Sequence, residues 1–145
     1  MELSSKVRYA LLALLELAKH HQQEDFLQIE QIAATQQIPE RYLAQLLMAL
    51  RRCGIVRSQR GAKGGYLLAR EPWQIRILDV LVCLEGAIEQ EANGNSALAT
   101  LESQVLKEVW QEANAAAMSV LERYTLQDLC DQRNDRQQSN PMYYI

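Results

Sequence analysis

Cationic side chains gather in one stretch of the chain, and their type suits contact with a polyanion. Residues 39–70 carry seven cations against a single acid, Glu40. The cations are Arg41, Arg51, Arg52, Arg57, Arg60, Lys63 and Arg70. Such an excess attracts phosphate-bearing partners, although solvated charges on helices and turns would give the same composition. The choice between these two interpretations depends on the elements that carry the charges.

Other kinds of chemistry find little support in the sequence. There is no paired nucleophile and base, and no H-E-x-x-H or G-x-S-x-G pattern, so we expect no catalytic residue and no enzyme activity. The segment RGAKGG is not a Walker loop, because Lys63 is followed by two glycines where the pattern needs Ser or Thr. His20 and His21 could bind a metal, but at a helix end they are more simply explained by the helix dipole. We therefore expect neither a metal site nor a cofactor.

The three cysteines, Cys53, Cys83 and Cys130, are odd in number and far apart. This argues against a disulfide framework and fits a reducing compartment. We expect Cys83 to be a small buried apolar side chain on its helix. Cys53 directly follows Arg51 and Arg52, close to the end of the helix predicted below for residues 39–52. Its oxidation could therefore perturb binding there, but simple packing is the favoured interpretation.

Length and composition predict one domain. The chain has 145 residues, of which 48% are hydrophobic. No apolar run reaches membrane-spanning length, and the N-terminal apolar stretch is broken by Glu16, so we expect a soluble, cytoplasmic protein with no membrane contact. The net charge of −3 hides an asymmetry: residues 1–70 have ten basic and six acidic side chains, whereas residues 71–145 have five and twelve.

Apolar spacing predicts how the cationic segment is built. Helices are expected over residues 5–19, 28–35 and 39–52, with a short turn at residues 36–38. In the third helix Pro39 occupies the first turn, leucines at three- and four-residue spacing face inward, and Gly54 ends the helix. Short β-prone runs at residues 55–56 and 66–68 then flank the glycine-rich, basic stretch RSQRGAKGG, which predicts a hairpin with a charged tip.

The second half predicts a helix over residues 75–85, a polar loop, and a long helix over residues 97–124 of about 40 Å. The apolar stripe of that long helix needs a partner, so we expect a symmetric homodimer, the alternative being that the helix folds back on its own chain. The expected dimer residues are Leu98, Leu101, Val105, Val109, Ala116 and Val120. A short capped helix over residues 125–131 and a solvated tail follow, and the terminal PMYYI either docks on a neighbouring surface or frays.

The order helix, helix, tight turn, helix and basic hairpin is typical of a winged helix-turn-helix DNA reader. The predicted fold class is therefore mainly α with a small β-hairpin, plus a long dimerisation helix. We expect a DNA-binding domain at residues 1–72, a helical linker and dimerisation region at residues 73–131, and a tail at residues 132–145. A winged-helix module that binds proteins is the alternative from another functional class.

Double-stranded DNA is thus the expected partner, and each candidate side chain has a predicted role. Major-groove base edges are acceptor-rich, which suits Arg41 and Gln45 on the third helix. Arg60 is expected to enter the minor groove. Phosphate contacts are assigned to Lys6, Arg51 and Lys63. Tyr42 contributes either its hydroxyl group or only packing.

Two segments also carry a resemblance to a known family. SSKVRYALLALLELA and IPERYLAQLLMALRRCGIVRSQRGAKGGYLLAR resemble the bacterial winged-helix regulators that include IscR, NsrR and CymR. The resemblance implies a homodimeric transcription factor, usually a repressor, that binds an imperfect palindrome. It also implies that Arg41 and Gln45 face DNA and that Arg60 enters the minor groove. Ala44 stands where IscR, the iron-sulfur cluster regulator of this family, has a glutamate. The base preference at this position is therefore left open.

The cofactor pattern departs from the cluster-bearing members of that family. They place three closely spaced cysteines before the long helix, whereas EGAIEQEANGNSALATLESQ contains no cysteine and no histidine. The chain therefore resembles the cluster-free, cysteine-metabolism type, in which control by a partner protein or a metabolite is implied. An iron-sulfur or redox-sensing regulator of the same family is the remaining alternative.

Overall fold

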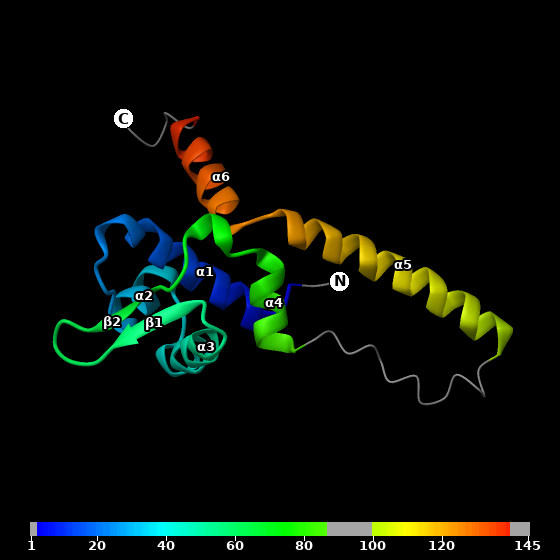
Figure 1. Ribbon diagram of the computed structural model, residues 1–145, viewed down its shortest axis with the longest axis horizontal. Coiled ribbons are helices and arrows are strands. Elements are labelled where there is room, and N and C mark those ends of the chain that lie inside the picture. The colour runs from blue at the N-terminus through cyan, green and yellow to red at the C-terminus, as the bar shows by residue number, and fades with distance from the viewer. Residues whose placement is uncertain (1–2, 87–99, 140–145) are drawn as a thin grey trace.

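The computed structural model describes residues 3–86 and 100–139. Within these ranges it is mostly helical and contains a two-stranded antiparallel sheet, which confirms the predicted fold class. Figure 1 shows the N-terminal helices and the hairpin gathered on one side, with a long helix projecting from them. No helix in the described ranges is long and apolar enough to cross a membrane.

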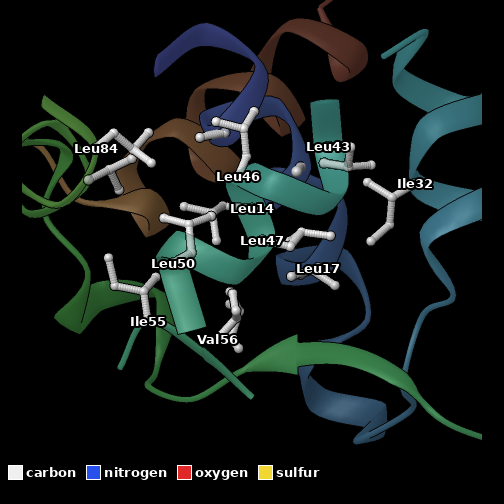
Figure 2. Packing of buried hydrophobic residues seen from close by; sticks show 14 of the residues in the cluster. Leu14, Leu17, Ile32, Leu43, Leu46, Leu47, Leu50, Ile55, Val56 and Leu84 are labelled. Atoms are coloured by element: carbon white, nitrogen blue, oxygen red, sulfur yellow. The ribbon is translucent and has the colours of Figure 1, made fainter. Parts of the chain in front are cut away.

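Three helices form the centre of the fold: α1 (Ser5–Lys19), α2 (Ile29–Gln36) and α3 (Glu40–Arg52). α1 starts at an N-cap, because Ser4 Oγ accepts a hydrogen bond from the Val7 N–H at 3.2 Å. The leucine stripe of α3 is buried against α1 and α2 (Figure 2). Its members are Leu43, Leu46, Leu47 and Leu50. Because one side of α3 is buried in this way, its opposite side is left facing outward.

The turn between α2 and α3 is fixed by backbone and side-chain contacts. Gln37 ends α2 in the left-handed region at φ 55°, and the next N–H, of Ile38, donates to the Ala33 carbonyl oxygen at 3.0 Å. The buried carboxylate of Glu16 on α1 accepts a hydrogen bond from Gln36 Nε2 at 2.6 Å and pairs with Lys19. These contacts hold α2 on α1 and so set the direction in which α3 leaves the turn.

The hairpin consists of β1 (Val56–Gln59) and β2 (Gly65–Leu68), paired from Val56 with Leu68 to Gln59 with Gly65. The strands extend further toward the tip than the sequence predicted. A third segment also joins, because Leu27 and Tyr66 exchange two backbone hydrogen bonds of 2.9 and 2.8 Å. A Cβ at Gly65 would overlap the Leu27 carbonyl group, so this pairing requires glycine there.

The remaining helices are α4 (Ile77–Glu85), α5 (Leu101–Arg123) and α6 (Leu126–Gln138), with the 3₁₀ turns η1 (His21–Gln23) and η2 (Pro72–Gln74). α4 begins two residues later than predicted, because the backbone before it is extended and paired with the α5–α6 junction. The N–H of Ile77 donates to Tyr124 O at 3.0 Å, and that of Leu126 donates to Ile75 O at 2.8 Å. The N-terminal ends of α4 and α6 and the C-terminal end of α5 therefore meet at one junction.

α6 is longer than the sequence predicted. Its start is as expected, since the Thr125 N–H donates to Asp128 Oδ2 at 2.8 Å and Thr125 Oγ1 accepts from the Asp128 N–H at 3.2 Å. Residues 132–138 continue the helix, so its predicted end at Asp131 is wrong, although most of these residues are exposed to solvent as expected. Leu126 and Cys130 anchor its first turns in buried positions, and arginine and glutamine are good helix formers once a helix has begun. The terminal PMYYI lies outside the described residues.

α5 does not fold back over its own chain. Its 23 residues include none that is buried, and it extends away from the other helices (Figure 1). The alternative in which its apolar stripe packs within one protomer is therefore wrong for residues 101–123. Leu98, another expected dimer residue, and the expected polar loop before it lie outside the described residues.

The interpretation of the cysteines needs correction. Cys53 and Cys83 form a disulfide with a Cα–Cα distance of 6.1 Å, although they are 30 positions apart. The sequence separation was misleading because α3 and α4 pack together, so that the end of one helix reaches the side of the other. Cys83 is half-buried and bonded rather than a plain apolar side chain, and Cys53 is exposed. Cys130 is a buried free thiol.

Candidate nucleic-acid interface

The outward face of α3 carries a row of long side chains. Arg41, Gln45, Met48 and Arg52 follow one another at spacings of four, three and four residues, and all are exposed. Arg41 and Gln45 were predicted to face outward and do so, with Ala44 half-buried between them. The spacing also predicts Met48 and Arg52 on this side of the helix, although neither was assigned a role in DNA contact. Guanidinium and amide groups on one helix face can donate hydrogen bonds to acceptors in a groove.

Tyr42 is half-buried and takes part in packing. Its ring meets that of Tyr9 on α1 edge to face, with centroids 5.7 Å apart. The exposed guanidinium of Arg8 lies 4.8 Å from the Tyr9 ring centroid. This aromatic pair favours the packing role for Tyr42, and it brings Arg8, a cation not predicted for the site, toward the start of α3.

Two of the predicted phosphate-binding cations lie on helices. Lys6 is exposed on the first turn of α1, and Arg51 is exposed on the last turn of α3, next to Arg52. Cations in the last turn of a helix also interact favourably with the negative end of its dipole. Both side chains are placed where a polyanion could reach them.

The wing tip, residues 60–64, presents Arg60 and Lys63 to solvent. The tip is ordered by a hydrogen bond from the Gly64 N–H to Gly61 O at 3.0 Å. Gln28 Nε2 also donates to Ala62 O at 3.1 Å, which ties the tip to the start of α2. A Cβ at Gly64 would overlap the Gln59 carbonyl oxygen, so glycine is required for this tight return. Gln28 is a positioning residue that sequence reasoning missed, since its partner lies 34 residues away.

Not every cation of residues 39–70 is available to a partner. Arg70 turns back to the end of α3, where its Nε donates to Gly54 O at 3.2 Å and its terminal nitrogen reaches Cys53 O at 3.5 Å. Arg70 therefore stabilises the helix terminus. The sequence grouped it with the six other cations of residues 39–70 as a candidate contact for a polyanion, and that prediction is wrong at this residue. His21, considered above as a metal ligand, lies with Nε2 3.1 Å from Glu71 Oε2.

One side of α5 carries a series of exposed apolar side chains. Leu101, Val105, Leu106 and Val109 line a groove, with exposed fractions between 55 and 75%. Trp110 at 66% and Val120 at 40% continue the apolar surface, and Ala116 is exposed as well. Leu106 and Trp110 were not predicted, because a stripe drawn with one residue per turn leaves out its flanks. A contiguous apolar surface of this kind marks an interaction site.

An ionic cluster holds the junction below α5. Arg76 donates to Asp79 Oδ1 at 2.8 Å and to Glu122 Oε1 at 3.1 Å, so it links the start of α4 to the end of α5. Burial would raise the pKa of Asp79, but hydrogen bonds from the Arg76 side chain and backbone outweigh it and lower that pKa below its usual value. The hydrogen bonds and negative charges of Asp79, and after it Glu122, raise the pKa of Arg76.

The residues present do not fit an iron-sulfur cluster. Cluster iron is held by cysteine thiolates, and of the three cysteines in this chain two are bonded to each other while the third is buried on α6. Within residues 3–86 and 100–139, no three histidine, cysteine or acidic side chains gather as a metal site would require. The sequence of the connecting segment 87–99 offers neither cysteine nor histidine.

Comparison with known proteins agrees with this geometry. The model of the Rrf2 family, described as iron-dependent transcriptional regulators, matches residues 3–132. The transcriptional regulator CymR of Bacillus subtilis is 39% identical over 147 aligned positions that cover 100% of both chains. The solved structure of IscR from T. potens has a TM-score of 0.78 at 34% identity, covering 94% of this chain and 91% of that chain. That of B. subtilis CymR, titled the global cysteine regulator, has a TM-score of 0.72 at 36% identity, covering 91% and 98%. The chain belongs to the Rrf2 family of DNA-binding helix-turn-helix transcriptional regulators, and it is not an enzyme.

Proposed function

We propose that this chain is a homodimeric repressor that binds a palindromic DNA operator in the bacterial cytoplasm and does so without an iron-sulfur cluster. The observation that carries the proposal is the exposed row of Arg41, Gln45, Met48 and Arg52 on a helix whose other side is buried. A helix held in this way can enter a major groove as a rigid body.

Each protomer then contacts DNA through two elements. α3 lies in the major groove, where Arg41 and Gln45 donate hydrogen bonds to base edges. The wing tip enters the neighbouring minor groove through Arg60, since a narrow groove concentrates negative potential. Phosphate contacts from Lys6, Arg51 and Lys63 set the orientation and most of the affinity. Tyr42 supports α3 through its ring, and residues 1–72 act as the DNA-binding unit.

A second copy of the chain is the proposed occupant of the apolar groove on α5. The described part of the chain buries none of α5, and its apolar side chains continue over several turns. Pairing through Leu101, Val105, Val109, Ala116 and Val120, with residues 73–131 as the linker and dimerisation region, would cover them. A two-fold axis between two DNA-binding units then requires a palindromic site.

The dependence of binding on salt separates DNA binding from the alternative of a protein-interaction module. DNA fragments would first be selected from a random pool with purified full-length protein and no added cofactor, and their affinity measured at several salt concentrations. We expect the logarithm of the affinity to fall linearly and steeply with the logarithm of salt, because phosphate contacts release counterions. Failure to enrich any sequence, or an affinity that does not change with salt, would contradict the proposal.

Repression is tested by transcription from a promoter that carries the selected site. We expect purified protein to lower transcript yield with the same concentration dependence as operator binding, because an occupied operator excludes the polymerase. Stimulated transcription would show an activator instead. The resemblance implies control by a partner protein or a metabolite. Adding such an effector would then shift the protein concentration at which transcript yield falls.

A further inference from the structure

The disulfide between Cys53 and Cys83 occupies a mechanically important position. Cys53 is the C-cap residue of α3, the helix that carries the proposed DNA-reading face, and Cys83 lies on α4. Figure 1 shows α3 lying between the hairpin and α4, and both neighbours pack against it. The bond therefore joins the end of the reading helix directly to the next layer of the fold.

α4 is in turn fixed to the base of the proposed dimerisation helix. Arg76, the N-cap residue of α4, pairs with Glu122 on α5, and Glu85 at its other end accepts a hydrogen bond from Ser4 Oγ at 2.9 Å. The Ile77 backbone adds a bond to Tyr124. A covalent bond from α3 to α4 therefore connects DNA reading to the element that orients one protomer relative to its partner.

The surroundings of the Cys53–Cys83 disulfide can accommodate its reduced form. Cys53 is exposed and accessible to a thiol, whereas the sulfur of Cys83 lies 3.4 Å from the Ala49 carbonyl oxygen, an acceptor for the S–H that reduction creates. The leucines of α3 are buried in the core, and neither cysteine belongs to that leucine stripe. Reduction thus removes the covalent link at Cys53 without unfolding the helix, because the buried side chain of Leu50 and the hydrogen bonds of Arg70 still hold the end of α3.

We propose that Cys53 and Cys83 form a reversible thiol–disulfide switch that sets the affinity for DNA, with the disulfide form binding more tightly. This inference rests on the proposed function for its effect on DNA. The crosslink favours tight binding because it fixes the C-terminal end of α3, which carries Arg51 and Arg52, relative to α4. In the dithiol form Arg51, Arg52 and Cys53 lose this covalent link to α4, so ordering them on DNA costs more conformational entropy.

A small-molecule thiol such as glutathione is the co-reactant of the switch. Its thiolate attacks the sulfur of Cys53, the more exposed residue of the pair. This attack breaks the protein disulfide, forms a mixed disulfide and releases Cys83 as a thiolate that takes up a proton. A second glutathione thiolate attacks the glutathione sulfur of the mixed disulfide and frees Cys53, which is protonated in turn. Two electrons and two protons pass to the protein, and oxidised glutathione is the product.

Cys130 does not compete in this exchange. It is buried on α6, where burial raises the pKa of its thiol and so keeps it in the less reactive protonated form. It supplies a control cysteine in the same chain. The disulfide form has one free thiol and the fully reduced form three, which makes the redox state countable by mass after alkylation.

The test uses full-length protein equilibrated in glutathione buffers of different reduced-to-oxidised ratio. Three quantities are measured in each buffer: the number of alkylated thiols, the amide hydrogen exchange of residues 49–53, and the affinity for the selected palindromic fragment at fixed salt. We expect a reversible change from three thiols to one, slower exchange in the disulfide form, and about tenfold tighter DNA binding, within the range of ordinary allosteric coupling. Cys53→Ser and Cys83→Ser should keep the weaker affinity in every buffer, whereas Cys130→Ala should respond as the unmodified chain does.

The outcomes separate this inference from the proposed function. Equal DNA affinity in the two redox states, or a pair that never forms in oxidised glutathione, overturns the switch while leaving the DNA-binding proposal intact. Absence of DNA binding in both states overturns the proposed function. The exchange data then decide the structural part, since equal exchange of residues 49–53 in the two states would show that the bond does not restrain α3.

Discussion

Individual side chains of the candidate site are positioned by contacts that extend beyond their own element. Arg60 depends on a tip returned by Gly64 and tied to Gln28, and the α3 row depends on the buried leucines behind it. The exposure of Arg41, Gln45, Arg60 and Lys63 could be predicted from spacing alone, because local periodicity decides which side of a helix or hairpin faces outward. The bonds of Arg70 and Gln28 could not, since their partners lie 16 and 34 residues away.

Replacement of the wing arginine tests the minor-groove contact. Arg60→Ala should weaken operator binding by about 1–3 kcal/mol and reduce any preference for A·T pairs beneath the wing. Fluorescence anisotropy at fixed salt would measure both effects. Arg136→Ala, which removes an exposed arginine from α6, is the matched control and should bind as the unmodified chain does. Unchanged affinity of Arg60→Ala would remove Arg60 from the interface.

The Asp79 carboxylate predicts a pH dependence of stability. Its pKa in the folded chain lies below the usual value of 3.8, chiefly because the hydrogen bonds of Arg76 outweigh burial. An unfolded chain then binds this proton more readily, so the stabilisation is complete above the unfolded pKa and is lost as pH falls through the folded pKa. We expect the free energy of unfolding to decline from about pH 5 downward. Asp79→Asn should reduce this decline, as measured by urea titrations at several pH values. Asp135→Asn, at an exposed position, is the control and should preserve it. If Asp79→Asn has the same pH profile as the unmodified chain, this explanation is contradicted.

At the scale of elements, the helices with buried stripes were predictable and the junctions between elements were not. α1, α2 and α3 show three- and four-residue apolar spacing, which arises within each helix. The pairing of Leu27 with Tyr66, the extended backbone before α4 and the Cys53–Cys83 bond all join segments distant in sequence. The extension of α6 was missed for a different reason: its last turns are polar and leave no apolar stripe to read.

The disulfide also predicts a stability difference. Bridging 30 positions restricts the unfolded chain, which is expected to stabilise the oxidised protein by about 3.6 kcal/mol relative to an unbridged chain. Chemical denaturation of oxidised protein and of Cys53→Ser would measure it, and Cys130→Ala serves as a control that retains the bridge. Equal denaturation midpoints for the oxidised protein and Cys53→Ser would show that the bridge adds no stability.

At the scale of the whole molecule, α5 carries the surface proposed to bind a second copy, and it projects away from the helices and hairpin proposed to bind DNA (Figure 1). Its 23 residues extend about 35 Å at 1.5 Å per residue, too far for the rest of one protomer to cover. The need for a partner was predictable from the length of the stripe. Its geometry was not, because the sequence of one chain carries no information on the angle at which two copies meet.

A charge placed on the apolar groove tests the dimer. Val109→Glu should convert particles of twice 16.6 kDa into monomers, because a buried carboxylate in the paired groove would lack a partner. Analytical ultracentrifugation would show the change in mass. Gln111→Glu adds the same charge at an exposed position about 160° around the helix from Val109 and should leave the mass unchanged. A Val109→Glu chain that still sediments at twice the monomer mass would place the interface elsewhere.

The most direct test of the DNA-reading face is a hydroxyl-radical and base-methylation footprint of full-length protein on the selected operator. Binding through α3 and the wing tip of two protomers should give two protected half-sites related by two-fold symmetry. Each half-site should show major-groove protection beside a minor-groove protection that disappears in Arg60→Ala. Their centres should lie a whole number of helical turns apart, on one side of the duplex. A single unsymmetrical footprint, or protection confined to phosphates with no base protected in the major groove, would contradict it.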